Sequence, residues 1–268
     1  MALLLILTAL LGIVAGWALT VPVHRYKELR PMTPRDLAAE AGSADHPPTV
    51  IRAEYREARC PTCHHVYRSA DVVPVLSWFR GCPECGTRLP ATVPLVQAGV
   101  PAAMVLTVAV LNGTWVALPY LWLVVVLAAV AVIDLRIWLI PWWMPWLGTA
   151  VGFVMICAVS LALDIPQSIL HAVIGGVGSF VLFFVLWLLA PGKLGFGDVR
   201  LMLLLGMFLG WLSPLLPIYG LLFGSLIGLA MGLASVVAAK GTRYPFGPAL
   251  ALGALVAVWL HQPLLHVG

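Results

Sequence analysis

Residues 195–198 read Gly195-Phe196-Gly197-Asp198 and lie between two long apolar runs. This position places the carboxyl group of Asp198 at or inside a membrane boundary. A carboxylate at the centre of a membrane helix costs about 2.5–3.5 kcal/mol on insertion scales, so it usually has a functional reason. A second such residue, Asp134, ends the apolar run before Arg136. We therefore treat these two aspartates as the candidate catalytic residues.

The composition is that of a polytopic membrane protein. The chain of 268 residues is 62% hydrophobic and only 10% charged, whereas an average soluble domain has about 25% charged residues. Its mean hydropathy is +1.01. We predict an all-α protein whose surroundings are a lipid bilayer, and we expect no nucleic-acid partner.

Apolar runs divide the chain into three regions. Residues 1–20 form a first helix, residues 21–92 a polar loop domain and residues 93–268 a seven-helix membrane domain. A helix that spans a membrane needs about 20 apolar residues. We predict about eight transmembrane helices, near residues 2–20, 94–111, 117–135, 142–162, 167–190, 198–212, 216–239 and 247–264.

The charges beside these runs predict the orientation. No basic residue precedes the first run, whereas Arg25, Lys27 and Arg30 follow it. Cytosolic loops of membrane proteins carry an excess of Lys and Arg. We therefore place the N-terminus outside and the loop domain in the cytosol. Alternating the spans then brings every Lys and Arg, and both candidate aspartates, to the cytosolic side.

Two pairs of cysteines predict a metal site in the loop domain. The pairs are Cys60-Pro-Thr-Cys63 and Cys82-Pro-Glu-Cys85, and 18 residues separate them. Four thiolates at this spacing suit a closed tetrahedral zinc site, and disulfides are rare in a reducing cytosol. We predict a structural zinc ion; a pair of redox-active dithiols is the alternative.

The two aspartates suit acid–base chemistry. A pair of carboxylates that share one proton provides an acid and a base for activating one water against a peptide carbonyl. Gly195 and Gly197 have no Cβ atom and would let an extended substrate backbone approach Asp198. The alternative is structural: Asp198 caps its helix, and Asp134 pairs with Arg136 or Arg200.

These motifs together resemble the prepilin peptidases, or type IV leader peptidases, which are intramembrane Gly-x-Gly-Asp aspartic proteases. The resemblance runs in order over nearly the whole chain. It is carried by Asp134 followed by Ile140-Pro141, by Gly195-Phe196-Gly197-Asp198 followed by Arg200, by the paired cysteines, by Asp71 to Trp78 between them, and by Pro245-Phe246-Gly247-Pro248.

The resemblance implies an activity and a substrate. Family members remove the short basic leader from type IV prepilins or type II secretion pseudopilins, at the cytosolic face of the bacterial inner membrane. Asp134 and Asp198 match the catalytic pair, and the supporting residues are Gly195, Gly197, Arg200 and Pro141. Many members also N-methylate the new N-terminus with S-adenosylmethionine. This chain lacks the asparagine that the family usually has at the end of its first helix, so its sequence does not decide methylation.

Two other functions remain open at this point. Intramembrane carboxylates also serve as proton relays, so a transporter with a cytosolic zinc-bearing regulatory module is one alternative. Transporters often contain inverted repeats, and we find no repeat in this sequence. A catalytically inactive assembly factor for pili is the other alternative, which the presence of both aspartates disfavours.

Overall fold

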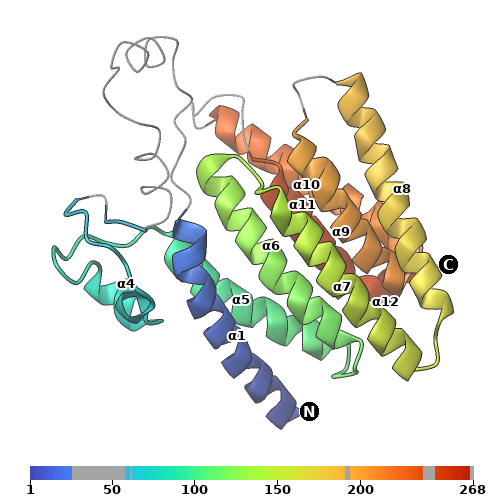
Figure 1. Cartoon of the computed structure of the whole chain (residues 1–268), viewed down its shortest axis with the longest axis horizontal. Helices are drawn as coiled ribbons and strands as arrows, with labels where there is room; N and C mark the ends of the chain where they lie inside the picture. Colours follow the sequence, from blue (N-terminus) through green and yellow to red (C-terminus); the bar gives the residue numbers. More distant parts are fainter. Residues whose placement is uncertain (26–57, 61, 191–193, 238–244, 266–268) are drawn as a thin grey trace.

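The structure is a computed structural model that describes residues 1–25, 58–60, 62–190, 194–237 and 245–265. The described part contains helices and an isolated bridge between Arg59 and Val66, but no strand. A helix lies at each of the eight expected positions, which confirms the all-α membrane class (Figure 1). These helices are α1 (Ala2–His24), α5 (Thr92–Val110), α6 (Ala117–Ile137), α7 (Trp143–Ala162), α8 (Gln167–Leu189), α9 (Phe196–Leu212), α10 (Leu216–Val237) and α11 (Gly247–Trp259).

Three short helices complete the described part. The 3-10 helix η1 (Ser69–Val72) and helix α4 (Leu76–Arg80) belong to the expected loop domain, and α12 (His261–Leu265) follows α11. Residues 26–57, which include Lys27 and Arg30, lie outside the described residues. The basic residues Lys193, Lys240 and Arg243 also lie outside them.

The bundle has a buried centre and an apolar outer surface. Six of the described helices, α1, α5, α6, α7, α8 and α10, are long and apolar enough to cross a membrane. Helices α9 and α11 have 17 and 13 residues, and most of their side chains are buried by neighbouring helices, as are those of α6. The outer helices expose many leucine and valine side chains, as expected of a surface in contact with lipid.

Small residues bring two pairs of helices into close contact. In the pair α8–α9, a Cβ added at Gly206 would clash with the backbone of Gly175, and one at Gly210 would lie 2.6 Å from the carbonyl oxygen of His171. In the pair α10–α11, a Cβ at Gly224 would lie 3.2 Å from Cα of Leu250. Small residues allow helices in lipid to approach until their backbones touch. Gly224 therefore has a packing role between α10 and α11.

Buried polar contacts tie the central helices together. The hydroxyl of Tyr120 on α6 donates to the carbonyl oxygen of Phe208 on α9 at 2.7 Å, and its ring stacks on that of Trp211 at 5.7 Å. The indole Nε1 of Trp211 donates to Ser160 Oγ on α7 at 2.8 Å. Buried polar groups need such partners, because an unpaired one costs about 1–3 kcal/mol.

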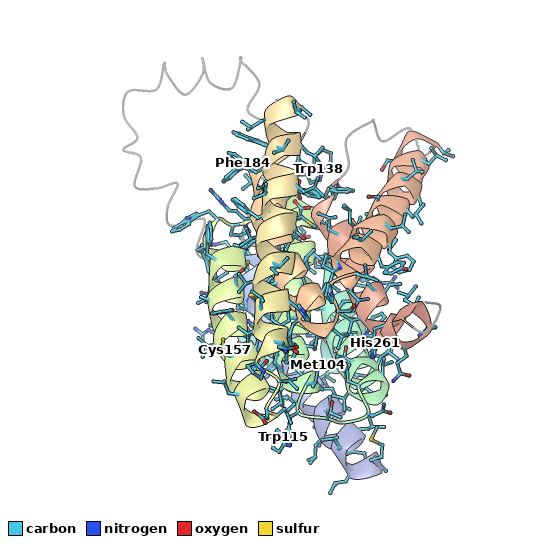
Figure 2. The ribbon with its side chains drawn as sticks, turned by 90° about the vertical axis from the view of Figure 1, so that its right-hand side faces the viewer. Met104, Trp115, Trp138, Cys157, Phe184 and His261 are labelled. Atoms are coloured by element: carbon cyan, nitrogen blue, oxygen red, sulfur yellow. The ribbon has the colours of Figure 1, made fainter. Side chains whose placement is uncertain are left out.

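The C-terminal ends of α1 and α6 lie at the same end of the bundle. Arg136 Nη1, near the end of α6, donates to the carbonyl oxygen of Val23, near the end of α1, at 3.2 Å. Figure 2 shows Trp138 and Phe184 towards this end and Trp115 at the opposite one. We call the end that carries Trp138 the polar end, because it carries both candidate aspartates and adjoins the paired cysteines.

Candidate active site

The two candidate aspartates come from separate helices and are both buried. Asp134 lies in the last turn of α6, and Asp198 lies in the first turn of α9. Their exposed fractions are 5% and 9%. The two carboxyl groups are close enough to interact electrostatically. Residues that are 64 positions apart in the sequence are therefore brought near each other because α6 and α9 both pack against α7 and α11.

A backbone amide from a third helix holds Asp134. The N–H of Gly247, the first residue of α11, donates to Asp134 Oδ2 at 3.0 Å. A Cβ atom at Gly247 would lie 2.6 Å from the same oxygen. Only glycine therefore leaves room for the carboxylate at this distance. Gly247 was not among the predicted site residues, although it lies in the Pro245-Phe246-Gly247-Pro248 motif that supported the family resemblance.

Ile140 connects the two sides of the site. A Cβ at Gly197 would lie 3.0 Å from Ile140 Cβ, and a Cβ at Gly247 would lie 3.3 Å from Ile140 Cδ1. One isoleucine side chain therefore packs against the glycines next to both aspartates. The expected supporting residue Pro141 follows Ile140 and is buried. Its carbonyl oxygen accepts from the N–H of Met144 at 3.1 Å, in the first turn of α7.

The Gly-x-Gly-Asp turn forms the start of α9. Gly195 is the N-cap residue, and the N–H of Asp198 donates to its carbonyl oxygen at 3.1 Å. A Cβ at Gly195 would lie 3.3 Å from Asp198 Oδ2. The carboxylate thus folds back towards Gly195. Gly195 therefore leaves room for the Asp198 carboxylate, and Gly197 leaves room for Ile140; their supporting role stays a prediction.

Arg200 lies one helical turn after Phe196 and packs on it. Its Cζ atom is 4.6 Å from the centroid of the Phe196 ring. Its Nε atom is buried and has no hydrogen-bond partner. The hydrogen bond described for Asp134 comes from Gly247, whereas the sequence left a pairing with Arg200 as one alternative. The guanidinium is therefore a cation that packs on the Phe196 ring.

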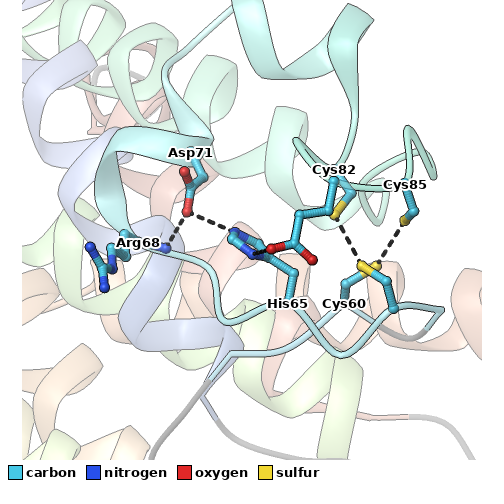
Figure 3. Close-up of polar contacts among 8 residues, drawn as sticks. Cys60, His65, Arg68, Asp71, Cys82 and Cys85 are labelled. Carbon is cyan, nitrogen blue, oxygen red and sulfur yellow. Dashed lines mark hydrogen bonds and ion pairs between the residues drawn. The ribbon is translucent and has the colours of Figure 1, made fainter.

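The four cysteines form a separate cluster, as their spacing predicts (Figure 3). All four sulfurs lie within 4.8 Å of one another, and the Cys60–Cys85 and Cys63–Cys82 pairs are each 3.6 Å apart. Tetrahedral zinc with Zn–S bonds of about 2.3 Å needs sulfurs about 3.8 Å apart. The cluster could therefore hold a zinc ion.

Both cysteine pairs have the same backbone turn, which supports a common ligand. The N–H of Cys60 donates to the carbonyl oxygen of His65, and the N–H of Cys82 donates to that of Thr87, both at 2.8 Å. The residue after each pair, His64 or Gly86, adopts a positive φ of 60° or 68°. Two separate segments thus present their thiols to one point in the same way.

His65 crosslinks the two cysteine turns. Its Nδ1 faces Glu84 Oε1 at 2.9 Å, and its Nε2 faces Asp71 Oδ2 at 3.2 Å (Figure 3). The hydrogen bonds to Asp71 and then Glu84 raise the pKa of His65 above its ordinary value. His65 therefore connects the first cysteine turn to the second and to η1. Its contacts stabilise the arrangement of the two turns that carry the sulfurs.

The cysteine cluster is docked on the membrane helices through Gln97 of α5. This side chain is 2% exposed. Its Nε2 donates to the carbonyl oxygen of Val72 at 2.7 Å and to Thr20 Oγ1 at 3.2 Å, and its Oε1 accepts from Trp78 Nε1 at 2.6 Å. In addition, Trp17 Nε1 of α1 donates to the carbonyl oxygen of Ser69 at 2.8 Å. We call the described residues 58–90 with this docking the cysteine module.

The fold and the site together define a helical membrane protein with two buried carboxylates at one end of its bundle. Residues 121–233 match the Type IV leader peptidase family, and residues 10–111 match the Bacterial Peptidase A24 N-terminal domain. The chain belongs to the type IV leader peptidase family. This membership confirms the predicted family and the prediction that the chain is a peptidase.

Curated relatives cover nearly the whole chain. The prepilin leader peptidase/N-methyltransferase of Aeromonas hydrophila is 33% identical over 94% of this chain and 89% of that protein. Those of Pseudomonas aeruginosa and Burkholderia pseudomallei are 32% and 31% identical, each over 94% of this chain and over 88% and 84% of the relative. No solved structure matches the chain.

Proposed function

We propose that the chain is an aspartic endopeptidase that removes the basic leader from type IV prepilins or type II secretion pseudopilins at the cytosolic face of the inner membrane. The observation that carries the proposal is the burial of Asp134 and Asp198 side by side at one end of a membrane bundle. Membership in the leader peptidase family and the names of the curated relatives support the substrate class.

The two carboxylates would divide the work of peptide hydrolysis. One takes a proton from the attacking water, and the other gives a proton to the carbonyl oxygen of the scissile peptide. The amide of Gly247 holds one Asp134 oxygen at 3.0 Å, so this carboxyl group keeps a fixed direction. Gly195 leaves room beside the Asp198 carboxylate, and Gly197 lets Ile140 pack close to the start of α9. Pro141 and Arg200 are the remaining supporting residues in this proposal.

The rest of the chain would deliver the substrate and stabilise the fold. We propose that residues 1–20 form the first membrane helix with the N-terminus outside, that residues 21–92 form a cytosolic domain, and that residues 93–268 form the peptidase domain. Cys60, Cys63, Cys82 and Cys85 would hold a structural zinc ion, whose binding supplies folding free energy to a small domain. The apolar helix of a prepilin would lie in the bilayer beside the bundle, with its scissile bond at the polar end.

The names of the curated relatives favour a second activity. Each of the three reported above is called a prepilin leader peptidase/N-methyltransferase. We propose that S-adenosylmethionine would supply the methyl group for the N-terminus that cleavage creates. Incubating the purified chain with a processed pilin and labelled S-adenosylmethionine tests this activity; label on the pilin supports it, and unlabelled pilin refutes it.

Cleavage is tested by mixing the purified chain with a prepilin and following the loss of the leader by gel mobility and mass. We expect cleavage by the wild type and none by Asp134→Asn or Asp198→Asn. Asp164→Asn is the matched control, because Asp164 is exposed in the loop between α7 and α8. This variant should cleave the prepilin as the wild type does. A wild type that leaves a prepilin uncut, when a curated relative cuts it, would favour the transporter or the inactive assembly factor.

A further inference from the structure

The inner face of α8 carries a row of aromatic rings that ends at the Gly-x-Gly-Asp turn. Phe180, Phe184 and Trp187 are spaced four and three residues apart, so they share one face of the helix. Neighbouring rings in the row are stacked, with centroids 6.1 Å and 5.9 Å apart. Figure 2 shows Phe184 towards the polar end of α8. The row is therefore directed at the start of α9.

Phe196, the variable residue of the Gly-x-Gly-Asp motif, is enclosed by this row. Its ring makes edge-to-face contacts with Trp187 at 5.2 Å and with Phe184 at 6.5 Å. The guanidinium of Arg200 covers the ring from α9 itself at 4.6 Å. Edge-to-face and cation–π geometries are the preferred arrangements of these groups. We call Phe184, Trp187 and Arg200 around Phe196 the aromatic box.

The box fixes the end of α9 that carries Asp198. At the other end of the pair, Gly206 and Gly210 bring the backbone of α9 against Gly175 of α8. Helix α8 is thus attached to α9 by backbone contact at one end and by aromatic rings at the other. Among the described residues, α8 contributes no polar side chain to the aspartate pair. Its contribution to the site is to hold α9.

We propose that Phe184 and Trp187 are positioning residues that set the direction of the Asp198 carboxylate through Phe196. This inference rests on the proposed peptidase function. Phe196 and Asp198 are two residues apart in the first turn of α9, so a rotation of this turn moves both. A displacement of reacting groups by about 1 Å can lower a rate on the order of 100-fold. Loss of the box should therefore lower kcat without weakening substrate binding.

The test compares Phe184→Leu and Trp187→Leu with Phe180→Leu, a matched control whose ring stacks on Phe184 but makes no described contact with Phe196. We expect kcat for prepilin cleavage to fall about 10- to 100-fold in the two box variants, with unchanged KM and melting temperature. Phe180→Leu should keep the wild-type kcat. Trp187→Phe keeps an aromatic ring, so its kcat should be much closer to the wild-type value than that of Trp187→Leu.

Some outcomes would overturn this inference and leave the proposed peptidase function intact. If the wild type cleaves and the box variants keep the kcat of Phe180→Leu, the box does not position Asp198. If KM rises while kcat stays constant, the box binds the substrate instead. If one box variant is poorly folded, a double-mutant cycle between the other box variant and Phe196→Leu decides: non-additive losses of kcat support the inference, and additive losses reject it. Absence of cleavage by the wild type would reject the proposed function itself.

Discussion

Gly247 has no side chain, and Asp134 occupies the space that one would need. A methyl group there would lie 2.6 Å from Asp134 Oδ2, so Gly247→Ala must displace the carboxylate or the start of α11. We expect cleavage to slow about 10- to 100-fold, as measured by kcat on a prepilin. Gly178→Ala is the control, because a Cβ at Gly178 in α8 meets nothing within 4 Å. Equal rates for the two variants would show that the Gly247 contact is unimportant.

The cysteine thiols make a second prediction for single residues. Removing one of four zinc ligands leaves an incomplete tetrahedral site, so Cys60→Ser should lose the metal. We expect zinc in the purified wild type, measured by mass spectrometry of the metal, and little in Cys60→Ser. Cys157→Ser is the control, because Cys157 lies in α7, away from the cluster. A wild type free of zinc after purification in zinc-containing buffer would favour redox-active dithiols instead.

At the scale of the elements, Gln97 joins the cysteine module to α1 and α5. Gln97→Leu keeps the approximate size of the side chain but leaves Trp78 Nε1 and the carbonyl oxygen of Val72 without their described partner. Each unpaired buried group costs about 1–3 kcal/mol. We expect trypsin to cut more rapidly in the module, where Arg80 and Arg88 are exposed.

The control for this experiment is Gln262→Leu, because Gln262 is exposed in α12. The rate of digestion is followed on gels with zinc-loaded protein in each case. If Gln97→Leu resists trypsin as well as Gln262→Leu does, Gln97 is not needed to hold the module. Other contacts, such as that of Trp17 with Ser69, would then be sufficient.

At the scale of the whole molecule, the orientation in the membrane can be tested by thiol labelling in intact cells. Phe79 is 84% exposed in the cysteine module, and Gln167 is exposed at the start of α8, at the opposite end of the bundle. With the N-terminus outside, a membrane-impermeant maleimide should label Gln167→Cys at once and Phe79→Cys only after the cells are permeabilised. The wild type gives the background from native cysteines, and the reverse pattern would invert the proposed topology.

Local patterns predicted most of the fold. Apolar runs are long and separated by polar or proline-rich breaks, so they located the helices to within a few residues; α5, expected at 94–111, spans Thr92–Val110. The spacing of the cysteine pairs likewise predicted a cluster before its distances were known. The end of α1 was less well predicted, because Val21 and Val23 continue the apolar run through Pro22.

Contacts between distant elements could not be read from those patterns. The amide of Gly247 reaches Asp134 because α11 packs directly against α6. In the same way, Trp187 appears in the sequence as one more apolar residue of a membrane helix, and only the packing of α8 on α9 brings it to Phe196. The burial of both aspartates likewise depends on contacts between separate helices, which no single segment of the sequence encodes.

The short length of α11 has a consequence for the access of water to the site. Its 13 residues rise about 20 Å, whereas the hydrocarbon layer of a bilayer is about 30 Å thick. The helix that begins beside Asp134 is therefore too short to cross an undistorted bilayer. Because neighbouring helices bury most of its side chains, the short α11 meets little lipid. The water molecule that peptide hydrolysis consumes would therefore reach the carboxylates from the polar end of the bundle and not through the surrounding lipid.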